Sequence, residues 1–343
     1  MHQMRAVTLT GYVEVASFVG LDGRRMLRQA GIATEALDEP ENRLPAEAVV
    51  RLLEDSARLS GCESVGLLMA EARSFASLGP LSLLLERLPN PREVVRACMV
   101  FQRHLNDVVL ISLEDEGDSC LIRLDVAPGY WGVQIFDQLV GIAYRVLTAA
   151  SGNRWKPACV HLVREAPDDL APWRRYFAAD IEFESNFNGL SCPTGSMVIP
   201  NALANEDMAR HARRLLQLVP LANEPGPISD RVRRTITLLL PSGRATLDQV
   251  TAQLGLSPRS LQRQLELEGH HFAGLLDAVR KELAAAYLGG TDRSVTAVAG
   301  LLGYASTGSF SRWFAGTFGM SPQAWRTERD ATTPAVPPPI WKP

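Results

Sequence analysis

Cysteine is scarce in this chain, and its cysteines are not arranged in pairs. The 343 residues hold five of them, and none forms a C-x-x-C motif: Cys62, Cys98, Cys120, Cys159 and Cys192. Because the number is odd and the spacing wide, the sequence predicts free, mostly buried thiols in a reducing compartment. A redox-sensing thiol is the weaker alternative, since buried structural cysteines are usually inert.

Long hydrophobic runs are also missing. The opening stretch, MHQMRAVTLTGYVEVASF, has no unbroken apolar core, because Glu14 interrupts its best run, and so it does not resemble a signal peptide. No segment reaches the ~18 apolar residues that a membrane helix needs. We therefore expect a cytoplasmic protein with no membrane partner.

Enzyme motifs are absent as well. The chain has no G-x-S-x-G, no phosphate-binding loop and no G-x-G-x-x-G. Its six histidines lack metal-ligand spacing, and His161, inside the apolar run ACVHLV, is interpreted as a satisfied buried histidine. The sequence therefore predicts no enzyme activity, no metal and no cofactor.

The charge is unevenly distributed between the two parts of the chain. The net charge is −3, but residues 228–328 hold 11 Lys and Arg against 8 Asp and Glu, while residues 1–227 hold 22 against 29. A basic C-terminal part on an acidic body favours a polyanionic partner for that part. The bias is mild and decides little by itself.

The length of the chain and one Pro-rich segment predict a division into two domains. With 46% hydrophobic and 21% charged residues it is an ordinary globular protein, and its length suits roughly two domains of about 150 residues. The Pro-rich segment PLANEPGP, residues 220–227, is the predicted linker. We expect domains at 1–219 and 228–328 and a disordered Pro-rich tail at 329–343.

The N-terminal domain combines helical and strand patterns. Helix starts are predicted at Pro45 and Asn90, and an apolar helix at 134–150. Runs of strand type fall at 108–114, 119–126, 158–163, 181–185 and 190–194, the first two joined by a turn at 115–118. The pattern predicts an α+β fold of mixed helices and a small sheet.

The C-terminal domain is predicted to be all helix, and two of its segments share one design. TLDQVTAQLGLSPRSLQRQL (246–265) and VTAVAGLLGYASTGSFSRWF (295–314) each read as a helix, a glycine turn and a capped second helix. This is the pattern of a helix-turn-helix, whose second helix enters the DNA major groove. The turn glycines, Gly255 and Gly303, lie 48 residues apart. A bridging helix of ~25 Å suits major grooves that repeat every ~34 Å.

Residues 228–328 resemble the DNA-binding domain of the AraC/XylS family of bacterial transcription regulators. The resemblance rests on residues 295–326, on Val279-Arg280 in the bridging helix and on Leu261-x-Arg263. Residues 75–95 and 181–193 resemble more loosely the effector domain labelled "arabinose-binding" in that family. The resemblance implies a promoter-binding regulator, such as an activator, that acts as a homodimer under a small-molecule effector, with RNA polymerase as a further partner.

The resemblance also assigns DNA-facing positions. These are Arg259, Gln262 and Arg263 in the first unit and Thr307, Gly308 and Arg312 in the second, with Ser260, Ser306 and Ser309 beside them. All lie off the apolar stripes of their helices, and Arg and Gln are side chains that read guanine and adenine. The aromatic residues Phe310, Trp313, Phe314 and Phe318 are interpreted as core and not as base-stacking groups, because their spacing makes one stripe.

The effector site is expected between the helix at 134–150 and the strands at 108–126, with four candidate liners: His104, Tyr130, Trp131 and Tyr144. Two alternatives stay open. One is a small-molecule-binding protein or enzyme whose helical C-terminus docks a protein. The other is a regulator without an effector.

Overall fold

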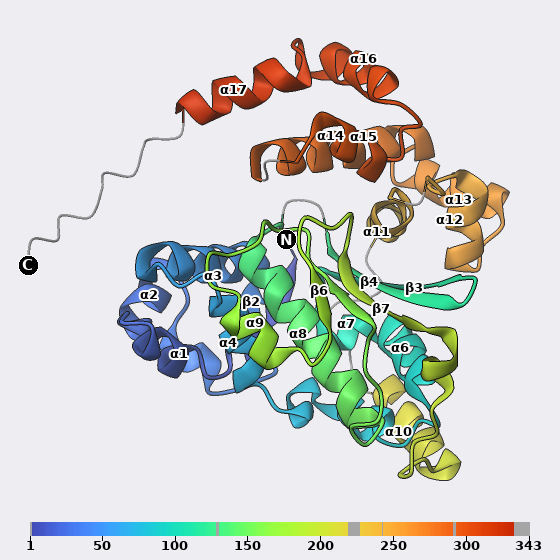
Figure 1. Cartoon of the computed structure of the whole chain (residues 1–343). Helices are drawn as coiled ribbons and strands as arrows, with labels where there is room; N and C mark the ends of the chain where they lie inside the picture. Colours follow the sequence, from blue (N-terminus) through green and yellow to red (C-terminus); the bar gives the residue numbers. More distant parts are fainter. Residues whose placement is uncertain (1, 128–129, 219–226, 242, 291–292, 333–343) are drawn as a thin grey trace, which may run out of the picture.

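The computed structural model describes residues 2–127, 130–218, 227–241, 243–290 and 293–332. An α+β body formed by the N-terminal part lies below a set of helices formed by the C-terminal part (Figure 1). This confirms the predicted fold class. The predicted linker at 220–227 lies outside the described residues except for Pro227, and the predicted tail at 329–343 lies outside them except for residues 329–332.

The first hundred residues form a helical layer that the sequence patterns largely missed. A two-stranded antiparallel ribbon pairs β1 (Gln3–Arg5) with β2 (Arg43–Pro45). Around it lie six helices: α1 (Tyr12–Phe18), α2 (Gly23–Gln29), α3 (Ala46–Ser60), α4 (Val65–Ala72), α5 (Pro80–Leu85) and α6 (Pro91–Val100). The predicted starts are confirmed: Pro45 precedes α3, and the Asn90 side chain accepts a hydrogen bond from the Glu93 amide at 3.0 Å.

A five-stranded sheet forms the middle of the N-terminal domain. Its order is β3-β4-β7-β5-β6, and all neighbours are antiparallel except β5 and β6. The predicted strands are confirmed with small shifts of their ends: β3 (Val109–Glu116), β4 (Ser119–Val126), β5 (Cys159–His161), β6 (Asp180–Glu182) and β7 (Asn188–Pro193). The β3–β4 hairpin is tighter than expected, because β3 runs on to Glu116.

Helix α8 (Val133–Ala150) packs against the sheet and against α4. Its predicted bounds are confirmed within one residue. At the crossing, the Gly66 amide donates to Oε1 of Gln134 at 2.8 Å, so the two helices are held together by a buried hydrogen bond. The domain is completed by α7 (Gln102–Leu105), α9 (Ala171–Tyr176), α10 (Glu206–Leu218) and the short 3-10 helices η1 (Ala6–Leu9), η2 (Thr34–Leu37), η3 (Phe75–Leu78) and η4 (Thr194–Val198).

The C-terminal domain is helical throughout its described residues, as predicted. Its elements are α11 (Ile228–Leu239), α12 (Leu247–Leu254), α13 (Pro258–Leu267), α14 (Phe272–Gly290), α15 (Val295–Leu301), α16 (Thr307–Phe318) and α17 (Pro322–Thr332). They share one core that includes Val279, Leu283, Phe310 and Phe314. Helix α17 ends at Thr332, four residues beyond the domain end expected at 328, because its helical pattern continues into the sequence assigned to the tail.

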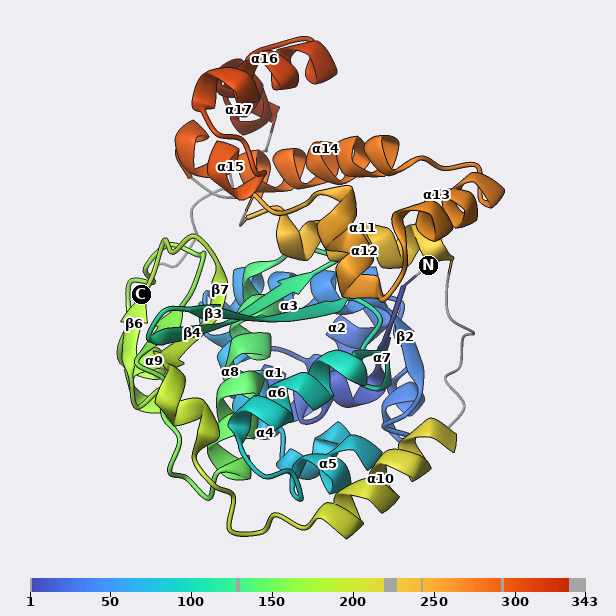
Figure 2. The same ribbon diagram turned by 90° about the vertical axis from the view of Figure 1, so that its right-hand side faces the viewer.

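The two domains meet at the hairpin β3–β4, above which α11 lies in both views (Figures 1 and 2). Successive side chains of a strand point to opposite faces. Ile122 and Leu124 of β4 point into the N-terminal domain, while Arg123 and Asp125 line a small space shared with the C-terminal domain. The hairpin is therefore the layer that separates the two interiors.

No helix within the described residues combines the length and the apolar character needed to cross a membrane.

The crossing of α4 and α8 tolerates no side chain at Gly66. A Cβ there would collide with the carbonyl oxygen of Gln134 and lie 2.9 Å from its Cα, and neither backbone atom can move without shifting α8. We expect Gly66→Ala to lower the free energy of unfolding by about 3 kcal/mol or more in urea denaturation. The control is Gly195→Ala, because a Cβ at Gly195 meets nothing within 4 Å. Equal stabilities for the two variants would contradict this packing.

Candidate nucleic-acid interface

The first helix-turn-helix unit consists of α12 and α13. Gly255 ends α12 with φ +67, a left-handed conformation that favours glycine. The Ser257 hydroxyl accepts a hydrogen bond from the Ser260 amide at 3.2 Å, and Pro258 takes the first helical position, where its missing N–H costs nothing. Leu261 and Leu265 are fully buried. The sequence signals therefore produce the predicted turn and cap.

The outer face of α13 is exposed and polar. Arg259, Gln262 and Arg263 are exposed and line one shallow hollow together with Ser260, which is half-buried. Neither arginine has a hydrogen-bond or ion-pair partner within the part of the chain that the structure describes. Two unpaired guanidinium groups on one helix face can bind phosphate or guanine.

The second unit consists of α15 and α16. Gly303 has φ +71, and a Cβ there would lie 2.9 Å from the carbonyl oxygen of Leu240, so this turn also excludes larger residues. The Ser306 hydroxyl accepts from the Ser309 amide at 3.2 Å, and the Ser309 hydroxyl donates back to the Ser306 carbonyl at 2.8 Å. The Thr307 hydroxyl bonds to the Thr296 hydroxyl at 3.1 Å, a contact between the two helices of the unit.

The aromatic face of α16 is core, as predicted. Phe310 and Phe314 are fully buried, and Phe314 stacks on Phe318 with ring centroids 4.2 Å apart. Trp313 is half-buried, and its Nε1 donates to Oδ1 of Asp277 on α14 at 2.7 Å. The sequence did not reveal this bond, which fastens the second unit to the bridging helix.

The opposite face of α16 is open to solvent. Gly308 is exposed, and a Cβ there would meet nothing within 4 Å. Arg312 is exposed and unpaired among the described residues. This face therefore offers one long cationic side chain, small hydroxyl groups and free space.

Helix α14 holds the two units at a fixed distance. Its 19 residues span about 28 Å, close to the ~34 Å repeat of the major groove. Val279 and Leu283 are buried in the core that α14 shares with both units. The geometry thus supports two recognition helices on one spacer.

The N-terminal domain has a cavity of about 100 Å³ between α8 and the hairpin β3–β4, the walls that the sequence predicted. None of the four predicted effector-binding side chains lines it. His104 bonds to the Leu216 carbonyl at 3.0 Å, and the Tyr144 hydroxyl accepts from the Ala178 amide at 3.1 Å. Tyr130 bonds to His2, and Trp131 packs where the domains meet. The structure does not bring the four side chains together.

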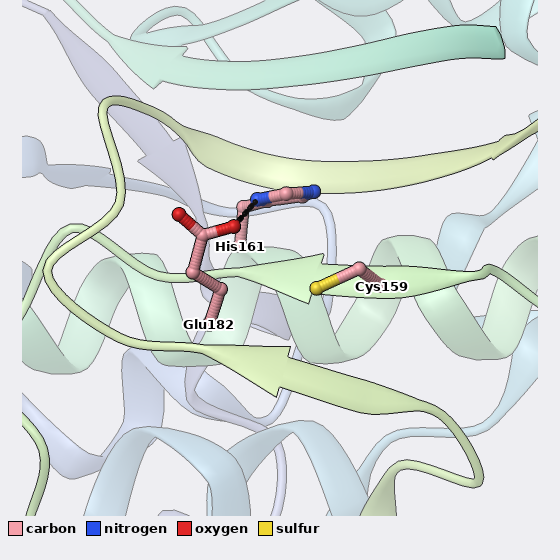
Figure 3. A group of neighbouring side chains, drawn as sticks. All are labelled: Cys159, His161 and Glu182. Carbon is pink, nitrogen blue, oxygen red and sulfur yellow. Dashed lines mark ion pairs between the residues drawn. The ribbon is translucent and has the colours of Figure 1, made fainter.

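A cluster that the sequence patterns did not reveal lies at the edge of the sheet. Cys159 and His161 lie two residues apart on β5, and Glu182 faces His161 from β6, so their ligating atoms lie within 4.8 Å of one another (Figure 3). These are donor types that zinc prefers, but structural zinc sites use four ligands. His161 already bonds to Glu182 at 3.1 Å and to Ser191 at 2.8 Å. The imidazole is satisfied without an ion.

Comparisons with known proteins place both domains. Residues 20–201 match the family model of the arabinose-binding domain of AraC transcription regulator, N-terminal part, and residues 250–328 match that of a helix-turn-helix domain. The transcriptional regulator VirS of Mycobacterium tuberculosis is 24% identical over 331 residues, covering 94% of this chain and 96% of VirS. The ornithine utilization regulator of Pseudomonas aeruginosa is 26% identical over 318 residues, covering 92% and 93%. The crystal structure of the regulator CdpR from P. aeruginosa matches with a TM-score of 0.42 at 21% identity, covering 89% of this chain and 96% of CdpR.

Proposed function

The chain belongs to the AraC family of DNA-binding transcription regulators, and we propose that it reads a promoter through two unequal recognition helices under the control of a small molecule. The observation that carries this proposal is the pair of capped helices α13 and α16, each with a buried apolar stripe and an exposed cationic face. As a regulator of bacterial genes it acts in the cytoplasm, and RNA polymerase is its further partner at the promoter.

The first unit reads bases through Arg259, Gln262 and Arg263. Arg hydrogen-bonds guanine and Gln hydrogen-bonds adenine through paired contacts in the major groove. The freedom of both arginines from partners within the described residues supports this role. Ser260 lies beside them, and the Arg259 amide of the first turn is available to phosphate, since Pro258 has no N–H and the Ser260 amide donates to Ser257.

The second unit holds DNA with less sequence preference. Its first turn carries Ser306, Thr307, Gly308 and Ser309, of which two hydroxyls are engaged with each other and one with Thr296. Gly308 has no side chain to reach a base edge. Arg312 is therefore the main base-reading group here, and the rest of the turn contacts phosphate.

Small-molecule control reaches the DNA-binding domain through the hairpin β3–β4. One face of the hairpin lines the cavity, and the other face touches the C-terminal domain. There, Nη2 of Arg293 donates to the Ser185 carbonyl at 2.6 Å. Burial raises the pKa of the nearby Asp125 carboxyl to about 7, against the opposing effect of Arg293. A ligand that shifts the hairpin moves Asp125 relative to Arg293 and changes the contact between β3 and α11.

An exposed apolar stripe on α10 supports the proposed homodimer. Met208 and Leu215 are 54% and 58% exposed, and they lie two turns apart on one face of the helix. Helix α10 lies at the end of the N-terminal domain that faces away from the recognition helices (Figure 2). A dimer formed there leaves both DNA-binding domains free.

We expect Arg263→Ala to weaken binding to the specific site by ~1–3 kcal/mol and binding to random DNA far less, because a lost base contact is specific to the sequence. The measurement is a titration of both DNAs at several salt concentrations. Arg58→Ala, an exposed arginine on α3, is the matched control. Equal loss on both DNAs would show that Arg263 contacts only the backbone. Binding that does not weaken with salt would favour a protein-docking C-terminus instead.

In a selection of bound sequences from a random pool, the half-site under residues 258–265 should carry more information than the half-site under residues 306–314. Gly308→Gln should sharpen preference at one added position, since the space around Gly308 is open. This variant should also be about 1 kcal/mol more stable, because Gly disfavours helix. A motif with as much information under the second unit as under the first would overturn the inequality.

The dimer proposal is tested by sedimentation velocity. We expect the full chain to sediment as a dimer and Leu215→Glu to shift it toward monomer, because a buried carboxylate at the interface is costly. Thermal melting should show that the variant stays folded, since Leu215 is exposed in the monomer. A monomeric wild type, or a dimer unaffected by Leu215→Glu, would rule out this surface.

A further inference from the structure

The cavity between α8 and the hairpin β3–β4 is apolar on nearly all sides. Its described lining is aliphatic except for a few side chains. The aliphatic walls come from both strands and from η3, α6, α7 and α8, and they include Val95, Ile111, Leu124, Ile142 and Val146. The polar members are Thr8, Arg73, Asn106 and Gln138, and none of the described lining residues is acidic.

Arg73 is the only cationic side chain among the described residues of this lining. It follows the last residue of α4 and lies on the cavity wall. Its Nε is buried and has no hydrogen-bond partner, and no carboxylate pairs with its guanidinium among the described residues. Burial, with a further effect of Arg5, lowers the pKa of Arg73 to about 10. Arg73 as a whole is half-buried, and a donor such as its Nε that is removed from water without an acceptor is costly in free energy.

The neighbouring Arg5 shows what Arg73 lacks. Arg5 is 1% exposed, and it is neutralised by Glu41, to which its Nε donates at 2.9 Å. Among the described residues, Arg73 has no carboxylate that pairs with it as Glu41 pairs with Arg5. The local charge balance calls for one more anion beside Arg73.

The other polar groups exclude several ligand classes. The Gln138 amide already donates to the Thr8 carbonyl at 2.8 Å, and Asn106 already accepts from the Val108 amide at 2.9 Å. These two bonds occupy part of the few polar groups on the wall, and its aliphatic remainder offers no partners to the hydroxyls of a sugar. Without an acidic side chain on the described wall, an ammonium group would also be unpaired, which disfavours amines and amino acids.

We propose that the effector is a compact apolar monocarboxylate whose carboxylate pairs with Arg73 and whose hydrocarbon part fills the aliphatic cavity. An apolar cavity of about 150 Å³ holds the six carbon atoms of one benzene molecule, so a cavity of about 100 Å³ takes a hydrocarbon part of about four or five carbon atoms, with the carboxylate at the wall beside Arg73. This assignment rests on the proposed effector control and adds to it the chemistry of the ligand.

The test compares three ligands with the same branched skeleton: 4-methylpentanoate, its neutral amide, and leucine, which adds an ammonium group. Calorimetric titration into the full chain should show the acid binding about tenfold tighter than either of the other two, since one charge-assisted contact contributes about that factor. Equal binding of acid and amide, tighter binding of leucine, or no binding of the acid would overturn the proposal.

Variants of Arg73 separate the contribution of its charge to ligand binding from the contribution of the apolar cavity. Arg73→Met should weaken binding of the acid about tenfold and leave the amide unchanged, while Arg73→Lys should keep part of the preference for the acid. Arg58→Met is the control at an exposed site. If Arg73→Met does not fold, the ligand comparison on wild type and the Arg73→Lys variant decide. Unchanged acid binding in a folded Arg73→Met protein would overturn the assignment.

DNA binding measured on the same samples separates this proposal from the regulatory function. If the chain binds its selected DNA and this binding responds to the neutral amide but not to the acid, effector control stands and the assignment of a carboxylate ligand is overturned. A chain whose DNA binding changes with the acid, and only when Arg73 is present, supports both.

Discussion

The alternation of side chains along the hairpin β3–β4 is the constraint on which the functional arrangement depends. Because successive residues point to opposite faces, Ile122 and Leu124 line the cavity while Arg123 and Asp125 face the C-terminal domain. No connecting chain is needed to carry a change from one interior to the other. A shift of the hairpin by a fraction of an ångström moves both sets of side chains together.

In the C-terminal domain, packing contacts hold the two helix-turn-helix units in place on one side of each helix and leave the outer side exposed to solvent. Buried aromatic rings and the Trp313–Asp277 hydrogen bond fix α16 on α14. The caps Ser257 and Ser306 fix where each recognition helix begins. Since these contacts use only one face of each helix, the arginines on the other face need no partner within the protein. The same division explains why a helix so rich in aromatic residues begins with a slim polar turn.

Local signals in the sequence were sufficient for the DNA-binding domain and insufficient for the effector site. Caps, turn glycines and apolar stripes act over a few residues, so the helix-turn-helix units could be predicted with their ends nearly correct. The cavity depends on α4, α8 and two strands that meet only through the fold. Arg73 is indistinguishable in sequence from a solvated arginine, and its neighbour Arg5 lies 68 residues earlier in the chain. The aromatic residues expected to bind the effector make other contacts, such as the bond that the Tyr144 hydroxyl accepts from the Ala178 amide.

The unpaired charge of Arg73 has a consequence for how ligand and conformation are linked. A ligand shifts an equilibrium only by the difference in its affinity for the two states. Nε of Arg73 is buried and lacks a hydrogen-bond acceptor among the described residues, so the arrangement seen here carries the cost of a donor removed from water. The anion that we propose would remove that cost, and would thereby stabilise this arrangement without any contact to the DNA-binding domain. Because the cavity wall is also the hairpin that touches α11, and α11 in turn contacts α12 and α13, an anion that stabilises this wall would on this proposal also stabilise the position of the first recognition unit.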